Sequence, residues 1–290
     1  MGQAMAAAVP AARAVFDEAD SALGFALSAI CAEGPIERLT ETEITQPALV
    51  ATSLACVAAL RDAGIEADLH VGHSVGEYAA LAAAGLASDL DAIRLVRARG
   101  EATAAAARRR PGAMAAILGL DDDVVEGLCE GIEGVWPANY NSPGQIVVSG
   151  TVDGVDALIA AAEVAGARRA IKLKVAGGFH SPLSASAGDD LRPVLETVEF
   201  RHPATRFFST TTVRDEDEHT IAQLLLDQLG APVRFTQTVQ VLRDEGVETF
   251  VEVGSGSVLS GLIRRIDRSL ATVSVQGPDD IPRLRGLLDA

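Results

Sequence analysis

Gly72-His73-Ser74-Val75-Gly76 is the stretch from which the fold of this chain can be worked out. It follows a short run of alternating apolar and polar residues, 68–71, and precedes an alanine-rich run, 77–86, typical of a helix. A Gly-x-Ser-x-Gly sequence between a strand and a helix is a nucleophile elbow, a tight turn that exposes the serine hydroxyl. Free N–H groups and the helix dipole at that point favour the oxyanion of acyl transfer. Gly and Ser also form loops without catalytic roles, but the strand-turn-helix context predicts Ser74 as a nucleophile.

The composition is that of an acidic globular protein. A length of 290 residues suits one large domain or two smaller ones, and an apolar content of 48% is enough for a core. The net charge of −16 argues against nucleic acid as a partner and otherwise favours solubility. Neither a signal peptide nor a membrane-spanning stretch is expected. Cys31, Cys56 and Cys129 are odd in number and far apart, so we expect no disulfide framework, no metal site and a cytoplasmic location.

The N-terminal part of the chain has the spacing of helices. Apolar positions over 3–30 predict an amphipathic helix with breaks near Pro10 and Gly24. A second helix is expected to begin at Pro47 and to cover 48–62, because proline suits a first helical turn. The elbow comes next, followed by a further helix over 90–107.

The pattern changes at 108–112. Beyond it, strand, helix, strand, strand, helix and strand are predicted in that order, over 113–119, 121–131, 135–140, 145–150, 152–165 and 168–175. This β-α-β-β-α-β order is the ferredoxin-like arrangement. We therefore expect 111–175 to form a small α+β subdomain inserted into a large α/β domain made of 1–110 and 176–290.

The large domain should resume with alternating elements. Helices are predicted over 183–198, 220–229 and 236–245, and strands over 205–209 and 247–253, the latter as the final strand. Strands that alternate with helices imply a parallel sheet covered on both faces.

An activated serine needs a base within hydrogen-bonding reach. His180 is the best candidate, because it follows two glycines and Phe179 and precedes Ser-Pro, which predicts a constrained loop. His73 adjoins the serine, so its ring should point away from the hydroxyl. The remaining histidines are expected to be packed or at the surface: His70, His202 and His219. A lone histidine is most often structural, so the residues alone leave both interpretations of His180 open.

The nucleophile stretch extended to Tyr78, Gly-His-Ser-Val-Gly-Glu-Tyr, resembles that of the malonyl-CoA:acyl carrier protein transacylases. Further segments resemble the same family in the same order, at 45–49, 97–100, 112–116, 139–145, 179–183 and 252–256. That family has a hydrolase-like α/β domain with a ferredoxin-like insert, in agreement with the element pattern. The resemblance implies transfer of malonyl from coenzyme A to the phosphopantetheine thiol of acyl carrier protein, without a metal or other cofactor. Fatty acid synthesis is the expected pathway, with polyketide supply and malonate decarboxylase maturation as alternatives.

The resemblance also implies catalytic roles. Ser74 would be acylated, with His180 as its base. The backbone N–H of Val75 would be one oxyanion donor. The main-chain carbonyl of Gln228 would orient the histidine, so that the Gln228 side chain should matter little.

Substrate contacts follow from the same resemblance. Arg99 would hold the malonyl carboxylate, since a guanidinium binds a carboxylate through two parallel bonds; without the resemblance a surface arginine would be the better interpretation. Gln46 and Phe179 would line the acyl pocket, and the phenylalanine predicts poor use of methylmalonyl-CoA. Ser184 stands where the family usually has methionine, which implies a slightly altered pocket.

Carrier docking needs a local basic patch, because acyl carrier proteins and this chain are both acidic. Two clusters are expected at the mouth of the cleft between the domains: Arg168, Arg169, Lys172 and Lys174, and Arg264 and Arg265. The alternative is that these cations merely offset neighbouring carboxylates.

The family begins with a strand and a Gly-Gln-Gly loop whose glutamine supplies a second oxyanion donor, and Met1-Gly2 aligns just after that loop. Without that segment, we expect an open strand edge, lower stability and weak or no transacylase activity. Two alternatives therefore stay open. One is a serine hydrolase or thioesterase that uses Ser74 and His180 with water as acceptor, and the other is a catalytically impaired family member that acts as a binding module.

Overall fold

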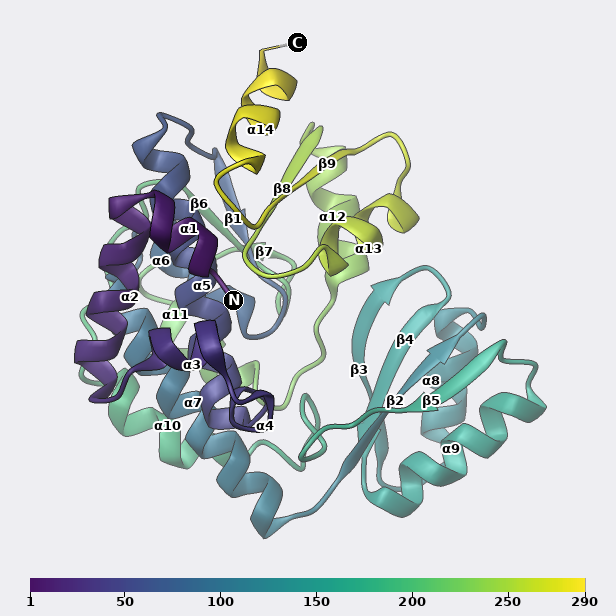
Figure 1. The fold of residues 1–290 in the computed structure, drawn as a ribbon. Coiled ribbons are helices and arrows are strands. Elements are labelled where there is room, and N and C mark those ends of the chain that lie inside the picture. The colour runs from purple at the N-terminus through teal and green to yellow at the C-terminus, as the bar shows by residue number, and fades with distance from the viewer. Residues whose placement is uncertain (290) are drawn as a thin grey trace.

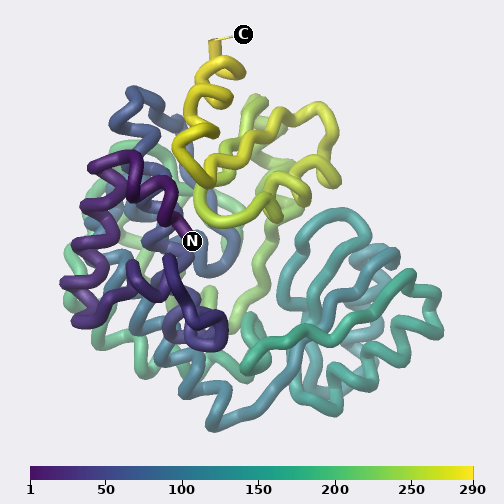
Figure 2. The backbone as a smooth tube through the Cα atoms, in the orientation of Figure 1, coloured from purple at the N-terminus to yellow at the C-terminus, as the bar shows by residue number. Residues whose placement is uncertain are grey.

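The computed structural model describes residues 1–289. Two regions lie side by side: a helix-rich region with short strands, and a sheet with helices on one of its faces (Figure 1). The chain passes between them twice, once after 109 and once before 180 (Figure 2).

The helix-rich region begins with four helices: α1 (Gln3–Ala8), α2 (Pro10–Leu23), α3 (Leu27–Glu33) and α4 (Ile36–Leu39). The helix predicted over 3–30 is therefore broken at Val9, directly before Pro10, and at Gly24, which has a positive φ of 71°. α2 and α7 (Asp89–Arg109) pack on the long helix α5 (Thr42–Asp62), and together they bury much of the main core.

α5 begins earlier than the sequence predicts, because Pro47 lies inside the helix rather than at its start. An internal proline has no N–H to donate, so the carbonyl four residues before it, that of Glu43, lacks its helical partner. Arg97 of α7 supplies one: its Nη1 donates to the Glu43 carbonyl at 2.6 Å. α5 is long and apolar enough to cross a membrane by length and composition, but 67% of that stretch is buried, as in a core helix.

The strands of this region form two separate sheets. β1 (Leu69–Val71) leads into α6 (Gly76–Ala83) and pairs in parallel with β6 (Arg206–Ser209), which pairs antiparallel with β7 (Arg214–Asp215). β8 (Thr249–Val253) and β9 (Ala271–Val275) form a parallel pair of their own. The predicted parallel sheet thus consists of two short pairs, and within residues 1–289 no strand pairs with the second edge of β1.

The prediction that 247–253 holds the final strand is wrong, since β9 follows it. The remaining helices of the region are α10 (Ala187–Leu195), α11 (Ile221–Asp227), α12 (Phe235–Asp244), α13 (Val258–Ile266) and α14 (Asp280–Leu288).

The second region is a four-stranded antiparallel sheet in the order β3-β4-β2-β5. Its elements are β2 (Ala113–Leu118), α8 (Asp122–Glu130), β3 (Val135–Ser142), β4 (Gln145–Gly150), α9 (Val152–Val164) and β5 (Arg169–Lys172). α8 and α9 pack on one face around Ile117, Tyr140 and Leu158 (Figure 1). The order of elements is the one that the sequence predicts, whereas the domain boundaries at 110/111 and 175/176 stay a prediction.

Strand β3 connects the two regions through its backbone. The Tyr140 N–H donates to the Val233 carbonyl and the Val233 N–H to the Ala138 carbonyl, both at 2.8 Å. The hydroxyl of Thr236 donates to the Tyr140 carbonyl at 3.1 Å. β3 is therefore bonded to the segment between α11 and α12 and to the first turn of α12.

Candidate active site

The turn between β1 and α6 has the geometry of an elbow. Ser74 has a φ of 53°, a conformation that non-glycine residues rarely adopt. A Cβ on Gly72 would lie 2.2 Å from the backbone of Gly76 and Glu77, so only glycine fits there. Gly76 has open space around it. Of the two glycines that identify the elbow in the sequence, Gly72 is therefore the one that the turn requires.

The hydroxyl of Ser74 contacts His180, with 2.6 Å between Oγ and Nε2. His180 also has a positive φ, 56°, in a loop whose packing requires small residues. A Cβ on Gly177 would lie 2.6 Å from the side chain of Ala107, and one on Gly178 3.0 Å from the Gly150 carbonyl. The loop is thus constrained, as the sequence predicts.

Two hydroxyls hold the His180 loop from within. Ser181 and Ser184 both donate to the Gly178 carbonyl, at 2.6 and 2.9 Å. Ser184, which stands where the family usually has methionine, is buried and uses its hydroxyl in this bond. Its polarity is therefore satisfied within the loop.

The contacts of His180 determine its tautomer. Nδ1 lies 3.0 Å from the Gln228 carbonyl oxygen and 3.1 Å from that of Ala231. A carbonyl oxygen only accepts, so Nδ1 carries the proton and Nε2 presents its lone pair to Ser74. Burial, then Arg99 and His73, lower the pKa of His180 from 6.5 to about 3, so the ring is neutral at pH 7. A neutral imidazole with a free Nε2 is suited to act as a general base.

Arg99 lies next to Ser74 and is buried, contrary to a surface role. Nη2 contacts Ser74 Oγ at 3.1 Å and Nη1 contacts Gln46 Oε1 at 2.7 Å. Nε has no hydrogen-bond partner within residues 1–289, and no carboxylate is paired with the guanidinium there. A buried cation with free donors and no counter-ion is suited to an anionic ligand.

The other two predicted pocket residues have different neighbours. Gln46 is buried and also donates to Thr103 Oγ1 at 3.3 Å, so its amide is fixed with its oxygen toward the guanidinium. Phe179 is half-buried and packs against Met114 and Val147 on the sheet of the second region.

The side chain of Gln228 makes contacts that the sequence does not predict. Its Oε1 accepts from Arg99 Nη2 at 3.2 Å, and its Nε2 donates to the Ser74 carbonyl at 3.3 Å and to Glu77 Oε2 at 2.6 Å. The sequence analysis assigned a role only to the main-chain carbonyl of Gln228 and therefore expected its side chain to matter little. Gln228 thus contacts Ser74, His180 and Arg99.

Two further polar residues that the sequence analysis did not single out lie around the elbow. Glu77 is fully buried, and burial raises its pKa. Asn141 Oδ1 accepts from His73 Nε2 at 2.8 Å, so this ring nitrogen is bonded to Asn141 and not to the serine hydroxyl. The Val75 N–H has no acceptor within residues 1–289, as an oxyanion donor requires.

The basic residues lie on the second region and on α13, all exposed. Leu118 pairs with both Gln145 and Arg169 across the sheet, and Arg265 Nη1 donates to Gln145 Oε1 at 2.6 Å. Arg169 and Arg265 are thus at the same end of the sheet, with Arg168 and Arg264 as their chain neighbours. Lys172 is paired with Asp156 at 2.6 Å.

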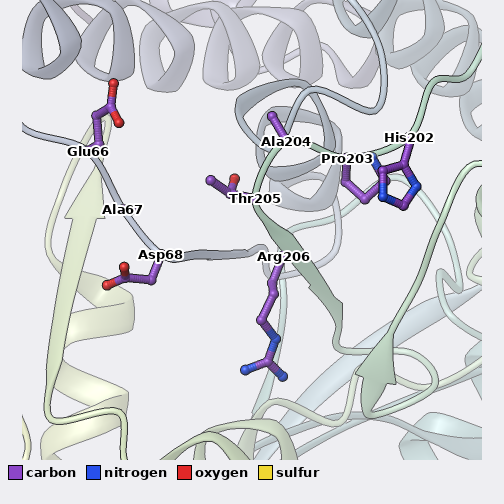
Figure 3. Close-up of a pocket in the computed structure, with 8 residues that line it drawn as sticks. All are labelled: Glu66, Ala67, Asp68, His202, Pro203, Ala204, Thr205 and Arg206. Carbon is purple, nitrogen blue, oxygen red and sulfur yellow. The ribbon is translucent and has the colours of Figure 1, made fainter.

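A pocket of about 550 Å³ lies at the amino ends of β1 and β6 (Figure 3). It is lined by the residues that precede β1 and begin β6: Glu66, Ala67, Asp68, His202, Pro203, Ala204, Thr205 and Arg206. Ser74 follows the opposite, carboxyl end of β1, which is where α/β proteins place their ligands. Over residues 1–289, no group of three His, Cys, Asp or Glu side chains is arranged to hold a metal ion.

Comparison with known sequences identifies the family of the chain. The family model described as the acyl transferase domain matches residues 1–278. The malonyl CoA-acyl carrier protein transacylase of Bacillus subtilis (strain 168) is 43% identical over 286 residues, which is 97% of this chain and 90% of that protein. The chain belongs to the malonyl-CoA:acyl carrier protein transacylase family. The family's enzyme from Escherichia coli (strain K12) is 40% identical over 279 residues, 94% of this chain and 90% of that protein.

Solved structures of the transacylase family have the same fold. The acyl-carrier-protein-S-malonyltransferase from Bartonella henselae superposes with a TM-score of 0.96 at 38% identity, covering 100% of this chain and 95% of that one. A malonyl-transacylase in complex with a type II polyketide acyl-carrier protein gives a TM-score of 0.94 at 37% identity, covering 99% and 94%. The chain thus has the α/β fold of the transacylases, as the sequence predicts.

Proposed function

We propose that this chain transfers a malonyl group from coenzyme A to the phosphopantetheine thiol of acyl carrier protein through an acyl ester on Ser74. The observation that carries the proposal is the pair of contacts at the serine hydroxyl, to His180 at 2.6 Å and to Arg99 at 3.1 Å. In a malonyl thioester the free carboxylate is only two carbons from the carbonyl that is attacked. A nucleophile that touches both a base and an unpaired guanidinium matches that spacing.

The first half-reaction loads the enzyme. Ser74 Oγ attacks the thioester carbonyl carbon while its proton passes to His180 Nε2. The Val75 N–H donates to the oxyanion that forms. The carbon–sulfur bond then breaks, and the coenzyme A thiolate takes the proton back from Nε2. The products are the malonyl ester of Ser74 and free coenzyme A, with His180 neutral again.

The second half-reaction reverses the order with another thiol. The carrier's phosphopantetheine thiol gives its proton to His180 Nε2 and attacks the ester carbonyl. The bond to Oγ breaks, and Oγ recovers the proton from Nε2. Coenzyme A is a substrate in this sequence, and every proton is moved by one histidine, so the proposal calls for no cofactor.

Arg99 would select malonyl over neutral acyl groups, with Gln46 fixing the guanidinium. The carboxylate would take the place of the counter-ion that the buried guanidinium lacks. Phe179 would limit space beside the acyl group. Carrier docking would use the end of the sheet where Arg168, Arg169, Arg264 and Arg265 gather, with Lys172 and Lys174 farther along β5 and beyond it. The family's place in fatty acid synthesis supports a cytoplasmic location.

Intact-mass spectrometry after mixing with malonyl-CoA tests the proposal. The chain should gain the mass of one malonyl group, Ser74→Ala should gain none, and adding carrier protein with its phosphopantetheine arm should move the group to the carrier. Loss of the ester to water at the same rate with and without carrier would identify a hydrolase instead. Labelling of Ser74→Ala at the rate of the unsubstituted chain would refute Ser74 as the nucleophile.

A further inference from the structure

Glu77 is a buried carboxylate to which the proposed reaction assigns no step. It lies in the first turn of α6, and its two oxygens have different partners. Oε1 accepts from the Thr210 N–H at 2.6 Å, with the hydroxyls of Thr210 and Ser209 at 2.7 and 3.1 Å. Within residues 1–289, Oε2 accepts only from Gln228 Nε2, at 2.6 Å. Each oxygen therefore faces an obligatory N–H donor.

The Gln228 amide lies between this carboxylate and the guanidinium of Arg99. Arg99 has only donors, so the amide must turn its oxygen toward Arg99, where Oε1 lies 3.2 Å from Nη2. Glu77 requires the amide nitrogen on the opposite side. The two constraints agree and leave the amide one orientation. The Arg99 guanidinium and the Glu77 carboxyl group are thus connected through the neutral Gln228 side chain, without direct contact.

This arrangement keeps the guanidinium available to a ligand. A carboxylate in direct contact with Arg99 would compete with a substrate carboxylate for the same N–H groups. An intervening amide presents a fixed acceptor to Nη2 but carries no net charge. The Glu77 carboxyl group stays on the far side of that amide.

We propose that Glu77 is a positioning residue for selection of the malonyl group. By holding the Gln228 amide in one orientation, it holds the Arg99 guanidinium in the position that binds the malonyl carboxylate. The inference rests on the proposed malonyl transfer and deepens it. The backbone N–H of Glu77 donates to the Ser74 carbonyl at 3.0 Å, but the carboxyl group does not contact the serine hydroxyl and would act on Arg99 through Gln228.

Glu77→Gln gives a sharp test, because it keeps the shape of the side chain. The Thr210 N–H demands an oxygen at the Oε1 position, so the introduced amide directs its nitrogen at Gln228. Gln228 must then turn its own oxygen toward position 77 and its nitrogen toward Arg99. Two donors would face each other at the guanidinium, and its fork would be displaced from the serine.

The measurement is the single-turnover rate of Ser74 acylation by malonyl-CoA and by acetyl-CoA, followed by mass spectrometry. In Glu77→Gln the ratio of the malonyl to the acetyl rate should fall about tenfold, the order expected for loss of one hydrogen bond to a charged group. The acetyl rate should change little, since acetyl has no carboxylate for Arg99 to bind.

Ser209→Ala is the matched control. It removes a bond to the same carboxylate from the Oε1 side and leaves the contact with Gln228, so it should lower the melting temperature while the malonyl-to-acetyl ratio stays unchanged. If Glu77→Gln fails to fold, Gln228→Met must show the same fall in ratio, because it removes the amide but keeps the carbonyl that accepts from His180.

Three results would overturn the inference: an unchanged ratio in Glu77→Gln, equal losses of both rates, or the same fall in ratio in Ser209→Ala. A failure of the proposed function would look different, because the unsubstituted chain would then show no malonyl uptake at all.

Discussion

The guanidinium of Arg99 and the hydroxyl of Ser74 are in direct contact, with 3.1 Å between Nη2 and Oγ. Arg99→Ala should therefore affect malonyl-CoA far more than acetyl-CoA. Loss of a hydrogen bond to a charged group costs about 1.5–3 kcal/mol, or roughly ten- to a hundred-fold in kcat/KM. Steady-state transfer to carrier protein, measured with each thioester, gives the two values. Equal losses would refute a role for Arg99 in binding the carboxylate.

The pH dependence of acylation should reflect the low pKa of His180. Burial, Arg99 and His73 hold that pKa at about 3, and kcat/KM reports the free enzyme. The base is then deprotonated from neutral pH down to about pH 5, so kcat/KM for malonyl-CoA should stay level over that range. An acid limb near the ordinary histidine value of 6.5 would contradict this prediction.

The effect of Arg99 on the pKa of His180 can also be measured. Arg99 is the leading charged group that lowers the pKa of His180, so Arg99→Ala should raise it and move the acid limb of acetyl-CoA turnover to higher pH. Arg97→Ala, on the same helix but outside the site, should leave the acid limb where it is.

Acid should destabilise the fold through His70 of β1. Burial, then Arg61, lower its pKa from 6.5 to about 4. Between these values the unfolded chain binds a proton that the folded chain does not, so stability is lost as pH falls below 6.5. In His70→Gln the drop in melting temperature from about pH 7 to about pH 5 should be smaller. An equal or larger drop in this variant would show that His70 does not contribute.

The bond between Arg97 and the Glu43 carbonyl should be coupled to Pro47. Arg97→Ala leaves that carbonyl without a donor, whereas Pro47→Ala restores the helical N–H. The destabilisation by Arg97→Ala should then be smaller in the Pro47→Ala background, with a coupling of about 0.5–1.5 kcal/mol in a urea-unfolding double-mutant cycle. Additive effects would show that Arg97 stabilises the helix only through its other contacts.

Carrier docking should depend on the basic end of the sheet. Arg169→Glu and Arg265→Glu should each raise KM for the acidic carrier and spare acylation by malonyl-CoA, because the carrier takes part only in the second half-reaction. Arg13→Glu on α2 makes the same charge change on the side of the molecule away from the sheet (Figure 1) and should leave carrier kinetics unchanged. Unchanged kinetics in both docking variants would mean that the arginines only offset nearby carboxylates.

The sequence predicts what is locally encoded. The elbow is a contiguous signal, so Ser74 could be named from five residues. His180 lies 106 residues farther on, and only its glycine-rich loop or the family resemblance could single it out. Glu77 looks like an acid at a helix N-terminus, and its burial becomes evident only when Thr210, 133 residues away, is placed beside it.

The errors of sequence interpretation have physical causes. Pro47 usually marks a helix start, but Arg97 accommodates it inside α5 by taking the freed carbonyl. β9, Ala271–Val275, has the same length as the predicted strand β8, and apolar and polar residues alternate in it, so its pattern was present in the sequence but was not interpreted as a strand. The Gln228 side chain gave no signal, because its contacts come from residues far away in the sequence.

The backbone bonds between β3 and Val233 have a consequence for engineering. Val233 is two residues from Ala231, whose carbonyl lies against His180 Nδ1. A chimaera that replaces 111–175 with the equivalent segment of another transacylase would exchange one strand of this pairing together with part of the surface proposed to face the carrier. Grafts that preserve the backbone path at 138–140 should keep the base aligned. Grafts that shift this register should load malonyl slowly even when their carrier-facing surface is intact.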